Sequence, residues 1–191
     1  MVQFTKKELR KKMLGVLNEF IIPKNSALNL INNLSEFFYS LNKEKLIVAG
    51  YYPTKTEPNI LSFLARLSEK KCYITLPVIK DSMEIDFCLW KVSDQVISSK
   101  HAAKIMEPLD KTIILNPDVI LAPLIACDNF GNRVGSGMGM YDKKISQLRL
   151  LNKDLKYVGI CYDFQVLENI EPEEHDQRLD AIVTEKKLIV C

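Results

Sequence analysis

The chain lacks the marks of several protein classes. None of its five cysteines forms a Cys-x-x-Cys pair, so neither a zinc knuckle nor a redox dithiol is indicated. The formal net charge is only +2, which argues against a general nucleic-acid coat. No apolar run approaches membrane-spanning length, and the N-terminus lacks the apolar core of a secretory signal. A cytoplasmic location is therefore expected.

Two further residue types are scarce. Histidine occurs twice, and His175 has no partner at zinc-ligand spacing along the sequence. Glycine occurs seven times, and three of the seven stand at alternate positions, Gly135, Gly137 and Gly139. The five separated cysteines are expected to be mostly buried thiols, and Cys127, near these glycines, has no neighbouring base that would make it a nucleophile.

The glycines lie in the middle of a strand, loop and helix pattern. Val119–Ala122 is an uninterrupted apolar run, typical of a strand covered on both faces, and Pro123 ends it. A polar segment and the glycines follow, and a helical pattern begins at Met140, with Ile145 and Leu148 on one face. This order brings free backbone N–H groups and a positive helix end to the carboxyl edge of a sheet, where phosphate is the natural ligand.

The glycine spacing by itself leaves two readings open. It matches neither a dinucleotide fingerprint, since Met140 stands where Gly or Ala is needed, nor a P-loop, since no Gly-Lys-Ser/Thr follows. The loop is then either an anion site or a plain tight connection. Arg133 and Asp142 favour the first reading, because one supplies a cation for phosphate and the other an oxygen ligand for Mg²⁺.

Helical and strand patterns alternate over the whole length, which favours an α/β fold with three layers, α/β/α, and a mainly parallel sheet. Thr5-Lys6-Lys7-Glu8 has the form of a capping box, and Leu9, Met13, Val16, Leu17 and Phe20 then share one face until Pro23. The other expected helices are 25–41 and 60–70, and 165–170 is a short helix or turn. The expected strands are 46–51, 72–76 (closed by Pro77), 85–89, 119–122, 157–161 and 179–183, with 92–108 weak strand or loop. No linker divides the chain, so 1–191 is expected to form one domain.

Four blocks of sequence resemble the 5-formyltetrahydrofolate cyclo-ligase (methenyltetrahydrofolate synthetase) family. They are Lys6-Lys7-Glu8-Leu9-Arg10, Tyr52-Pro53-Thr54-Lys55-Thr56-Glu57, the glycine motif from Asp128 to Lys143, and Glu174-His175-Asp176-Gln177-Arg178-Leu179-Asp180. They occur in the family's order over nearly the whole chain. The motif departs from the family pattern at Met140 for Tyr, Lys143 for Arg, and Ser136 and Met138 where some members are basic.

The resemblance implies a reaction and a fold group. The reaction is the ATP- and Mg²⁺-dependent closure of 5-formyltetrahydrofolate to 5,10-methenyltetrahydrofolate, with release of ADP and phosphate. Phosphorylation turns the formyl oxygen into a leaving group, and the neighbouring folate nitrogen then closes the ring, so no protein nucleophile is required. The implied fold is similar to the sugar-phosphate isomerase and CoA-transferase group. The expected partners are ATP and the folate, with or without a polyglutamate tail, and the expected state is a monomer that binds no nucleic acid and no membrane.

The resemblance also assigns roles residue by residue. The basic side chains Lys6 and Arg10, four apart on a helix and otherwise a solvated basic face, become ATP contacts. Asp176, otherwise part of an acidic loop, becomes the second metal ligand beside Asp142, and Arg133 and Asp142 are the catalytic residues. The full ATP set is Lys6, Arg10, Arg133, Val134, Gly135, Ser136, Gly137, Met138, Gly139, Met140 and Tyr141. The folate set is Tyr52, Glu57, Ser136, Gly137, Met138, Gly139 and Met140.

Two rival functions share parts of this pattern. An isomerase or transferase of the related fold, acting on phosphorylated sugars or CoA esters, would have a similar sheet but would not need ATP. A non-catalytic folate- or nucleotide-binding protein would keep the glycine loop and lose the metal acids. The presence of both Asp142 and Asp176 argues against the second rival.

Overall fold

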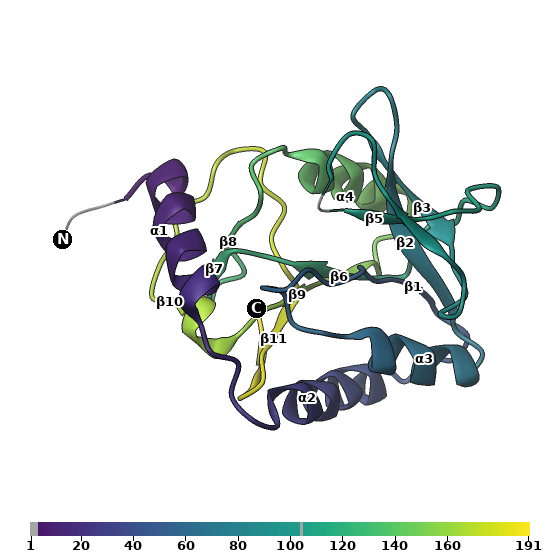
Figure 1. The fold of residues 1–191 in the computed structure, drawn as a ribbon, viewed down its shortest axis with the longest axis horizontal. Coiled ribbons are helices and arrows are strands. Elements are labelled where there is room, and N and C mark those ends of the chain that lie inside the picture. Colours follow the sequence, from purple (N-terminus) through teal and green to yellow (C-terminus); the bar gives the residue numbers. More distant parts are fainter. Residues whose placement is uncertain (1–3, 104) are drawn as a thin grey trace.

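The computed structural model describes residues 4–103 and 105–191, and it alternates helices and strands over much of the chain (Figure 1). The helices are α1 (Lys6–Glu19), α2 (Ser26–Ser40), α3 (Leu61–Glu69), α4 (Met140–Leu151) and the short 3-10 helix η1 (Asp163–Gln165). The strands are β1 (Ile47–Ala49), β2 (Tyr73–Ile79), β3 (Ile85–Leu89), β4 (Val96–Ser98), β5 (Met106–Pro108), β6 (Val119–Pro123), β7 (Ala126–Asp128), β8 (Arg133–Val134), β9 (Lys156–Ile160), β10 (Val166–Leu167), β11 (Ala181–Val183) and β12 (Leu188–Val190).

A seven-stranded sheet forms the centre, in the order β12-β11-β9-β6-β1-β2-β3. All pairs from β11 to β2 are parallel, and only the two edge pairs, β11 with β12 and β2 with β3, are antiparallel. The sheet is therefore mixed but mainly parallel, as the alternation predicts. From β1 the chain continues to β2 on one side, and β6 later pairs on the other side. The carboxyl ends of β1 and β6 thus border the kind of crevice in which open α/β sheets bind ligands.

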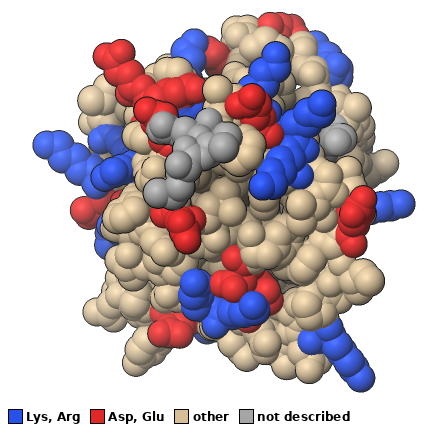
Figure 2. All heavy atoms as spheres, turned by 90° about the vertical axis from the view of Figure 1, so that its left-hand side faces the viewer, with Lys and Arg blue, Asp and Glu red and all other residues tan. Residues whose placement is uncertain are grey.

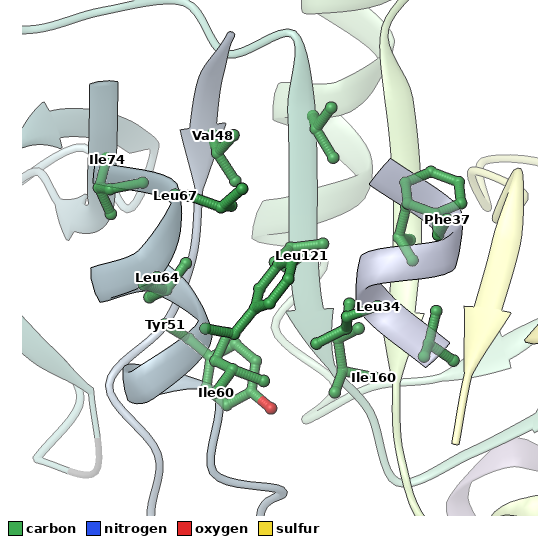
Figure 3. Close-up of a cluster of buried hydrophobic side chains, with 14 of the residues drawn as sticks. Leu34, Phe37, Val48, Tyr51, Ile60, Leu64, Leu67, Ile74, Leu121 and Ile160 are labelled. Atoms are coloured by element: carbon green, nitrogen blue, oxygen red, sulfur yellow. The ribbon is translucent and has the colours of Figure 1, made fainter. Parts of the chain in front are cut away.

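Helices cover both faces of this sheet (Figure 1). On one face, Leu34 and Phe37 of α2 and Leu64 of α3 pack against Val48 and Leu121 of the strands (Figure 3). On the other face, α4 buries its apolar side, including Ile145 and Leu148, against the sheet. Burial on both faces explains why β6 is an unbroken apolar run rather than an alternating one.

Helix α1 stands apart from these layers, beside a small three-stranded sheet in the order β10-β7-β8 (Figure 1). The predicted capping box is present: Thr5 Oγ1 accepts from the Glu8 N–H, and Glu8 reaches back to the Thr5 N–H. Leu9 and Met13 pack against this sheet. The prediction for Val16 is wrong, since its side chain is 43% exposed. A small sheet buries only a narrow stripe of the helix, and Val16 lies outside that stripe.

The expectation that Pro77 closes a strand is also wrong, because β2 runs on to Ile79. The Thr75 carbonyl accepts the Gly50 N–H at 2.9 Å, just past the end of β1. Pro77 faces the same side two residues later, where no neighbouring strand needs an N–H donor. The next donor on that side, the Ile79 N–H, bonds to the buried carboxylate of Glu107 at 2.9 Å. Pro123 likewise forms the last residue of β6 rather than following it.

Several short elements lie outside the predicted pattern. The polar segment before the glycines forms the hairpin β7–β8, and β12 adds a strand after the last one expected. The 165–170 segment gives the end of η1 and β10 instead of a helix of its own. Three of the five cysteines, Cys88, Cys127 and Cys161, are buried as expected, whereas Cys191 is exposed. Within the described residues, no helix has the length and apolar character to cross a membrane.

Candidate active site

The glycine loop follows β8 and leads directly into α4. Gly137 (φ +97°) and Gly139 (φ +64°) have left-handed backbone conformations, and Gly139 is the N-cap of the helix. Side chains rarely adopt these conformations, which explains glycine at both positions. None of the amides of residues 136–139 donates a hydrogen bond to another described residue. With the first N–H groups of α4, these exposed amides face outward at the positive helix end, an arrangement that suits an anion.

An ion pair between Arg133 and Asp142 joins the two ends of this loop. The Arg133 Nη2 donates to Asp142 Oδ1 at 2.7 Å, and the two side chains are only 10% and 12% exposed. The guanidinium also lies 5.3 Å from the centre of the Tyr157 ring. Burial works to lower the pKa of Arg133, but Tyr157 and Asp142 outweigh it and raise that pKa, so the cation persists. At Gly135, a Cβ atom would lie 2.8 Å from Arg133 Nη1, so glycine leaves room for the guanidinium.

Helix α1 contributes both of its predicted cations to this place. Arg10 Nε donates to the Gly135 carbonyl at 2.7 Å, and its guanidinium lies against Gly137, with Cζ 3.0 Å from where a Cβ atom would be. One turn earlier, Lys6 forms an ion pair with Asp176, whose side chain is 16% exposed. The two basic residues therefore reach the glycine loop and the acidic segment from the same face of one helix.

The segment around Asp176 closes the site from the third side. The Gln177 N–H donates to Asp142 Oδ1 at 2.9 Å, so the residue after Asp176 touches the carboxylate that holds Arg133. Burial works to raise the pKa of Asp176, but the hydrogen bond from Lys6 and the Glu173 N–H lower it overall. No described residue donates a hydrogen bond to Asp142 Oδ2 or to Asp176 Oδ1. Each carboxylate thus keeps one oxygen for a further ligand.

The two residues predicted to bind folate lie in the loop after β1. Glu57 accepts the Thr54 N–H at 2.8 Å, and Tyr52 packs edge-on against Trp90 with ring centres 6.4 Å apart. The pKa of Tyr141 in the first turn of α4 is raised, chiefly by burial, then by Tyr157 and by the charge of Glu57. The negative charge of Glu57 therefore acts on the first turn of α4. Trp90 itself is buried, so it packs rather than lines a groove.

The remaining residues of the predicted loop set differ in which atoms they can offer. Ser136 and Met138 are exposed. Val134 and Met140 are buried. Val134 pairs with Ala126 in the β7–β8 hairpin, and Met140 packs into the core beneath α4. All the predicted site residues from 133 to 142 therefore lie together, but two of their side chains belong to the scaffold.

Although His175 has no partner at zinc-ligand spacing along the sequence, the fold places two acidic side chains close to it. Ligand atoms of Glu173, His175 and Asp176 all lie within 4.8 Å of one another. His175 and Glu173 are exposed, however, and Asp176 is bonded to Lys6. This cluster adds to the acidic wall of the site, and exposed groups of this kind are common without a metal.

Sequence reasoning missed two contributors, Gln177 and Tyr157. Gln177 acts through its backbone N–H, which every residue except proline carries, so its side chain gives no signal. Tyr157 stands in an apolar strand, where an aromatic residue reads as core. A basic residue near the sheet edge would have been the only hint, because a guanidinium often stacks on an aromatic ring.

A separate cavity of about 170 Å³ lies away from the glycine loop. Its walls come from the start of α2, the Pro58–Asn59 turn and Tyr162 at the end of β9. It shares no residue with the ATP or folate set, although Pro58 follows Glu57 directly. The candidate site is therefore the open surface of the glycine loop, and this mainly apolar pocket is not part of it.

The side of the molecule that carries α1 has basic and acidic side chains interspersed, with neither sign covering it (Figure 2). The cations that matter are the few that converge on the glycine loop beside two carboxylates. A mainly parallel sheet with such a loop at its carboxyl edge is typical of α/β enzymes that bind phosphate groups.

Comparison with known proteins gives the family. The family model of 5-formyltetrahydrofolate cyclo-ligase matches residues 2–185. The 5-formyltetrahydrofolate cyclo-ligase of Mycolicibacterium smegmatis is 26% identical over 150 residues, 75% of this chain and 76% of that protein. The enzyme of the same name from Escherichia coli K12 is 37% identical over 71 residues, 37% of this chain and 38% of that protein. This chain belongs to the 5-formyltetrahydrofolate cyclo-ligase family, and it is an ATP-using ligase of folate one-carbon metabolism.

Solved structures agree. The NMR structure of 5,10-methenyltetrahydrofolate synthetase from Aquifex aeolicus superposes with a TM-score of 0.80 at 26% identity, covering 97% of this chain and 92% of that one. A 5,10-methenyltetrahydrofolate synthetase from Mycoplasma pneumoniae gives a TM-score of 0.75, covering 95% and 99% of the two chains. At 22% identity, the second likeness supports the fold alone.

Proposed function

We propose that the exposed amides of residues 136–139, the adjoining backbone of residues 135, 140 and 141, and Arg133 bind the phosphates of ATP, with Lys6 and Arg10 closing over them from α1. The observation that carries this is the convergence of three distant segments on one loop. Arg10 bonds to Gly135, Lys6 bonds to Asp176, and the Gln177 N–H bonds to Asp142. Positive groups on two sides of an amide-lined loop match the charge of a triphosphate.

The reaction needs alignment and charge neutralisation rather than a protein nucleophile. The formyl oxygen of 5-formyltetrahydrofolate attacks the terminal phosphorus of ATP, and the bond to ADP breaks. The neighbouring folate nitrogen, a secondary amine outside the pterin ring, then attacks the formyl carbon and loses its proton, phosphate leaves, and the five-membered ring of 5,10-methenyltetrahydrofolate closes. Arg133, held by Asp142 and the Tyr157 ring, would neutralise charge on the phosphoryl group in transfer. This ion pair is the reason that Arg133 and Asp142 are proposed as the catalytic residues.

The donor set fits Mg²⁺. Asp142 and Asp176 each keep one carboxylate oxygen to which no described residue donates a hydrogen bond. Magnesium binds hard oxygen ligands, keeps several waters and needs one or two carboxylates in addition to phosphate oxygens. Bound there, the ion would supply further charge neutralisation at the phosphates. The two aspartates would hold it, directly or through water.

The folate is proposed to bind between the Glu57 loop and the glycine loop. Glu57 keeps one carboxylate oxygen beyond its bond to the Thr54 N–H, so it can accept an N–H group of the pterin. Tyr52 offers a ring supported by Trp90 for stacking or packing. Residues 136–140 form the opposite wall, mainly with backbone atoms and the exposed Ser136 and Met138.

The finer features of the enzyme follow the same proposal. It acts as a monomer of one domain, 1–191, in the cytoplasm, and ATP, Mg²⁺ and the folate are its partners. Relation of its fold to the sugar-phosphate isomerase and CoA-transferase group is part of this proposal as well. The mainly parallel sheet, with helices on both faces, supports that relation.

The test mixes purified protein with 5-formyltetrahydrofolate, ATP and Mg²⁺, and follows the absorbance band of the methenyl product. We expect the band to appear only when all three are present. Omission of ATP separates this reaction from the chemistry of an isomerase or transferase of related fold, which needs no nucleotide. A band that forms at the same rate without ATP would contradict the proposal, and chelation of Mg²⁺ tests the metal in the same cuvette.

A further inference from the structure

Arg149, near the end of α4, lies outside every motif described above, yet it makes three polar contacts with one segment. Its Nη1 donates to Gln177 Oε1 at 3.1 Å. Its Nη2 donates to the Arg178 carbonyl at 2.8 Å and to Asp180 Oδ2 at 2.9 Å. The Arg149 guanidinium therefore binds the last turns of α4 to the segment 177–180.

This segment is the one that closes the active site. The Gln177 N–H holds Asp142, and Asp176 immediately before it pairs with Lys6. The side chain of Gln177 is bound by Arg149 while its backbone holds Asp142. A shift of this residue would thus move two groups at once, the N–H group at Asp142 and the neighbouring carboxylate of Asp176.

A second line of contacts leads from Arg149 to the same place. Asp180 Oδ2 also accepts the Tyr157 N–H at 2.8 Å, and this bond joins the segment to the start of β9. The Tyr157 ring in turn faces the Arg133 guanidinium at 5.3 Å. Both lines therefore end at the Arg133–Asp142 pair, one through the carboxylate and the other through the cation.

We propose that Arg149 is a positioning residue for the nucleotide and metal site: it fixes the segment 176–180 so that Asp176 and Asp142 face the glycine loop together. The inference rests on the proposed function, since it gives the two aspartates their metal role. Arginine suits the position because its planar fork donates in several fixed directions at once. A lysine ammonium is a point charge on a flexible stem, and it would not hold an amide oxygen, a carbonyl and a carboxylate in the same geometry.

The test compares Arg149→Met and Arg149→Lys with Lys144→Met. Lys144 is the control because it also joins α4 to another element, Asp86 of β3 at 2.8 Å, and forms no hydrogen bond or ion pair with 176–180; its side chain is 15% exposed, against 28% for Arg149. Binding of ATP with Mg²⁺ is measured by calorimetry without folate, alongside the rate at varied Mg²⁺ and the melting temperature. We expect Arg149→Met to weaken Mg²⁺-dependent ATP binding and to raise the half-maximal Mg²⁺ concentration about 10-fold, as outer-shell partners of metal ligands do. Arg149→Lys should recover only part of this, and Lys144→Met should change the melting temperature alone.

A purely structural role predicts a different pattern. If Arg149→Met lowers the melting temperature but binds ATP and Mg²⁺ as the wild type does, the inference is wrong. Full recovery by Arg149→Lys would overturn the part played by the fork. Should Arg149→Met not fold, Gln177→Ala replaces it: that change removes one acceptor, keeps the backbone N–H, and should weaken Mg²⁺-dependent binding about 3-fold on the same outer-shell argument.

Asp142→Asn separates this inference from the proposed function. If Asp142→Asn weakens Mg²⁺-dependent binding while the Arg149 and Gln177 variants do not, only the positioning role fails. If Asp142→Asn binds ATP and Mg²⁺ normally as well, the proposed metal site itself is wrong.

Discussion

The two halves of the glycine motif are built in opposite ways. In the first half, Asp128 is fully buried and accepts hydrogen bonds from four donors: the N–H groups of Phe130, Asn132 and Ile170, and Asn132 Nδ2. In the second half, the amides of residues 136–139 bond to no described residue, and Asp142 keeps a free oxygen. The carboxylate of the first half is fully used by hydrogen bonds within the fold, whereas the amides and the Asp142 oxygen of the second half are available to a ligand.

This difference separates scaffold from site inside a single sequence block. A buried carboxylate with four donors is satisfied, and it has no capacity left for a ligand. Unpaired amides at a helix N-terminus remain stable only because they are exposed to solvent or to a ligand. Substitutions in the first half should therefore change stability, and substitutions in the second half should change activity. The predictions below test that division.

The largest effect is expected for Asp142→Asn. The amide can still accept the Gln177 N–H, so the protein should remain folded, but the negative charge beside Arg133 and the metal ligand are lost. Turnover should fall by about 100-fold or more. Steady-state rates and thermal unfolding measure both quantities. Asp86→Asn is the control. Asp86 likewise forms an ion pair with a basic residue, Lys144, but it lies outside the glycine loop. Full activity of Asp142→Asn would remove Asp142 from the site.

Asp128→Ala tests the other half of the motif. Four donors, three of them buried, lose their acceptor, and the expected loss in the free energy of unfolding is about 3–5 kcal/mol. For a chain of this length that corresponds to a fall in melting temperature of roughly 10 °C. Calorimetry or circular dichroism measures it. The folded fraction should retain its affinity for ATP, and a stable but inactive variant would show that the division is wrong.

Two glycines sharpen the comparison. A Cβ atom at Gly131 (φ +84°) would lie 2.6 Å from the Leu179 carbonyl oxygen, a backbone atom that cannot move easily. A Cβ atom at Gly137 (φ +97°) would meet only the end of the Arg10 side chain, at 3.0 Å. Gly131→Ala should therefore cost about 2 kcal/mol of stability.

For Gly137→Ala we expect a smaller loss of stability, about 1 kcal/mol, together with a KM for ATP that rises about 5-fold as Arg10 is displaced. Denaturant unfolding and ATP titrations of the two variants, made side by side, give the contrast. Equal effects of both substitutions on the KM for ATP would contradict the division of the motif into a scaffold half and a site half.

The smallest effect concerns pH. The pKa of Asp176 in the folded protein is lowered overall by Lys6 and the Glu173 N–H, although burial opposes them. This carboxylate therefore adds stability above its unfolded pKa of about 3.9, and that contribution is lost as the pH falls through the lower folded value. Solvent screening limits it to less than about 1 kcal/mol. Urea unfolding at neutral pH and near pH 3 should show a smaller acid loss in Lys6→Met than in the wild type. Equal losses would contradict the pairing.

The sequence predicted the parts of the fold and site that depend on local patterns. The capping box at Thr5, the apolar run of β6 and the glycine loop before α4 each have a signature within a few residues. The hairpin β7–β8 has no signature in the hydrophobic pattern, because its strands are only three and two residues long and Asp128 holds the polar turn between them through hydrogen bonds. The expectation for Pro77 was wrong because the end of β1 at Ala49, which pairs with Thr75, decides which donors β2 must supply.

Within the site, residues were predictable when their side chains carry the chemistry. Lys6, Arg10 and Asp176 came from family motifs, and the structure brings all three to the glycine loop. Gln177 and Arg149 have no such signature, since one uses a backbone group and the other acts on a segment 28 residues away. The assignment of ligands to these residues remains a prediction.

The bond between Lys6 and Asp176 spans 170 positions of the chain. A ribosome releases the helix that carries Lys6 long before the acidic segment that meets it. If ATP binds as proposed, its binding surface is incomplete until Asp176 has been synthesised, and the nucleotide then gives no help to a shorter nascent polypeptide. Earlier folding would depend on the hydrophobic sheet rather than on the ligand.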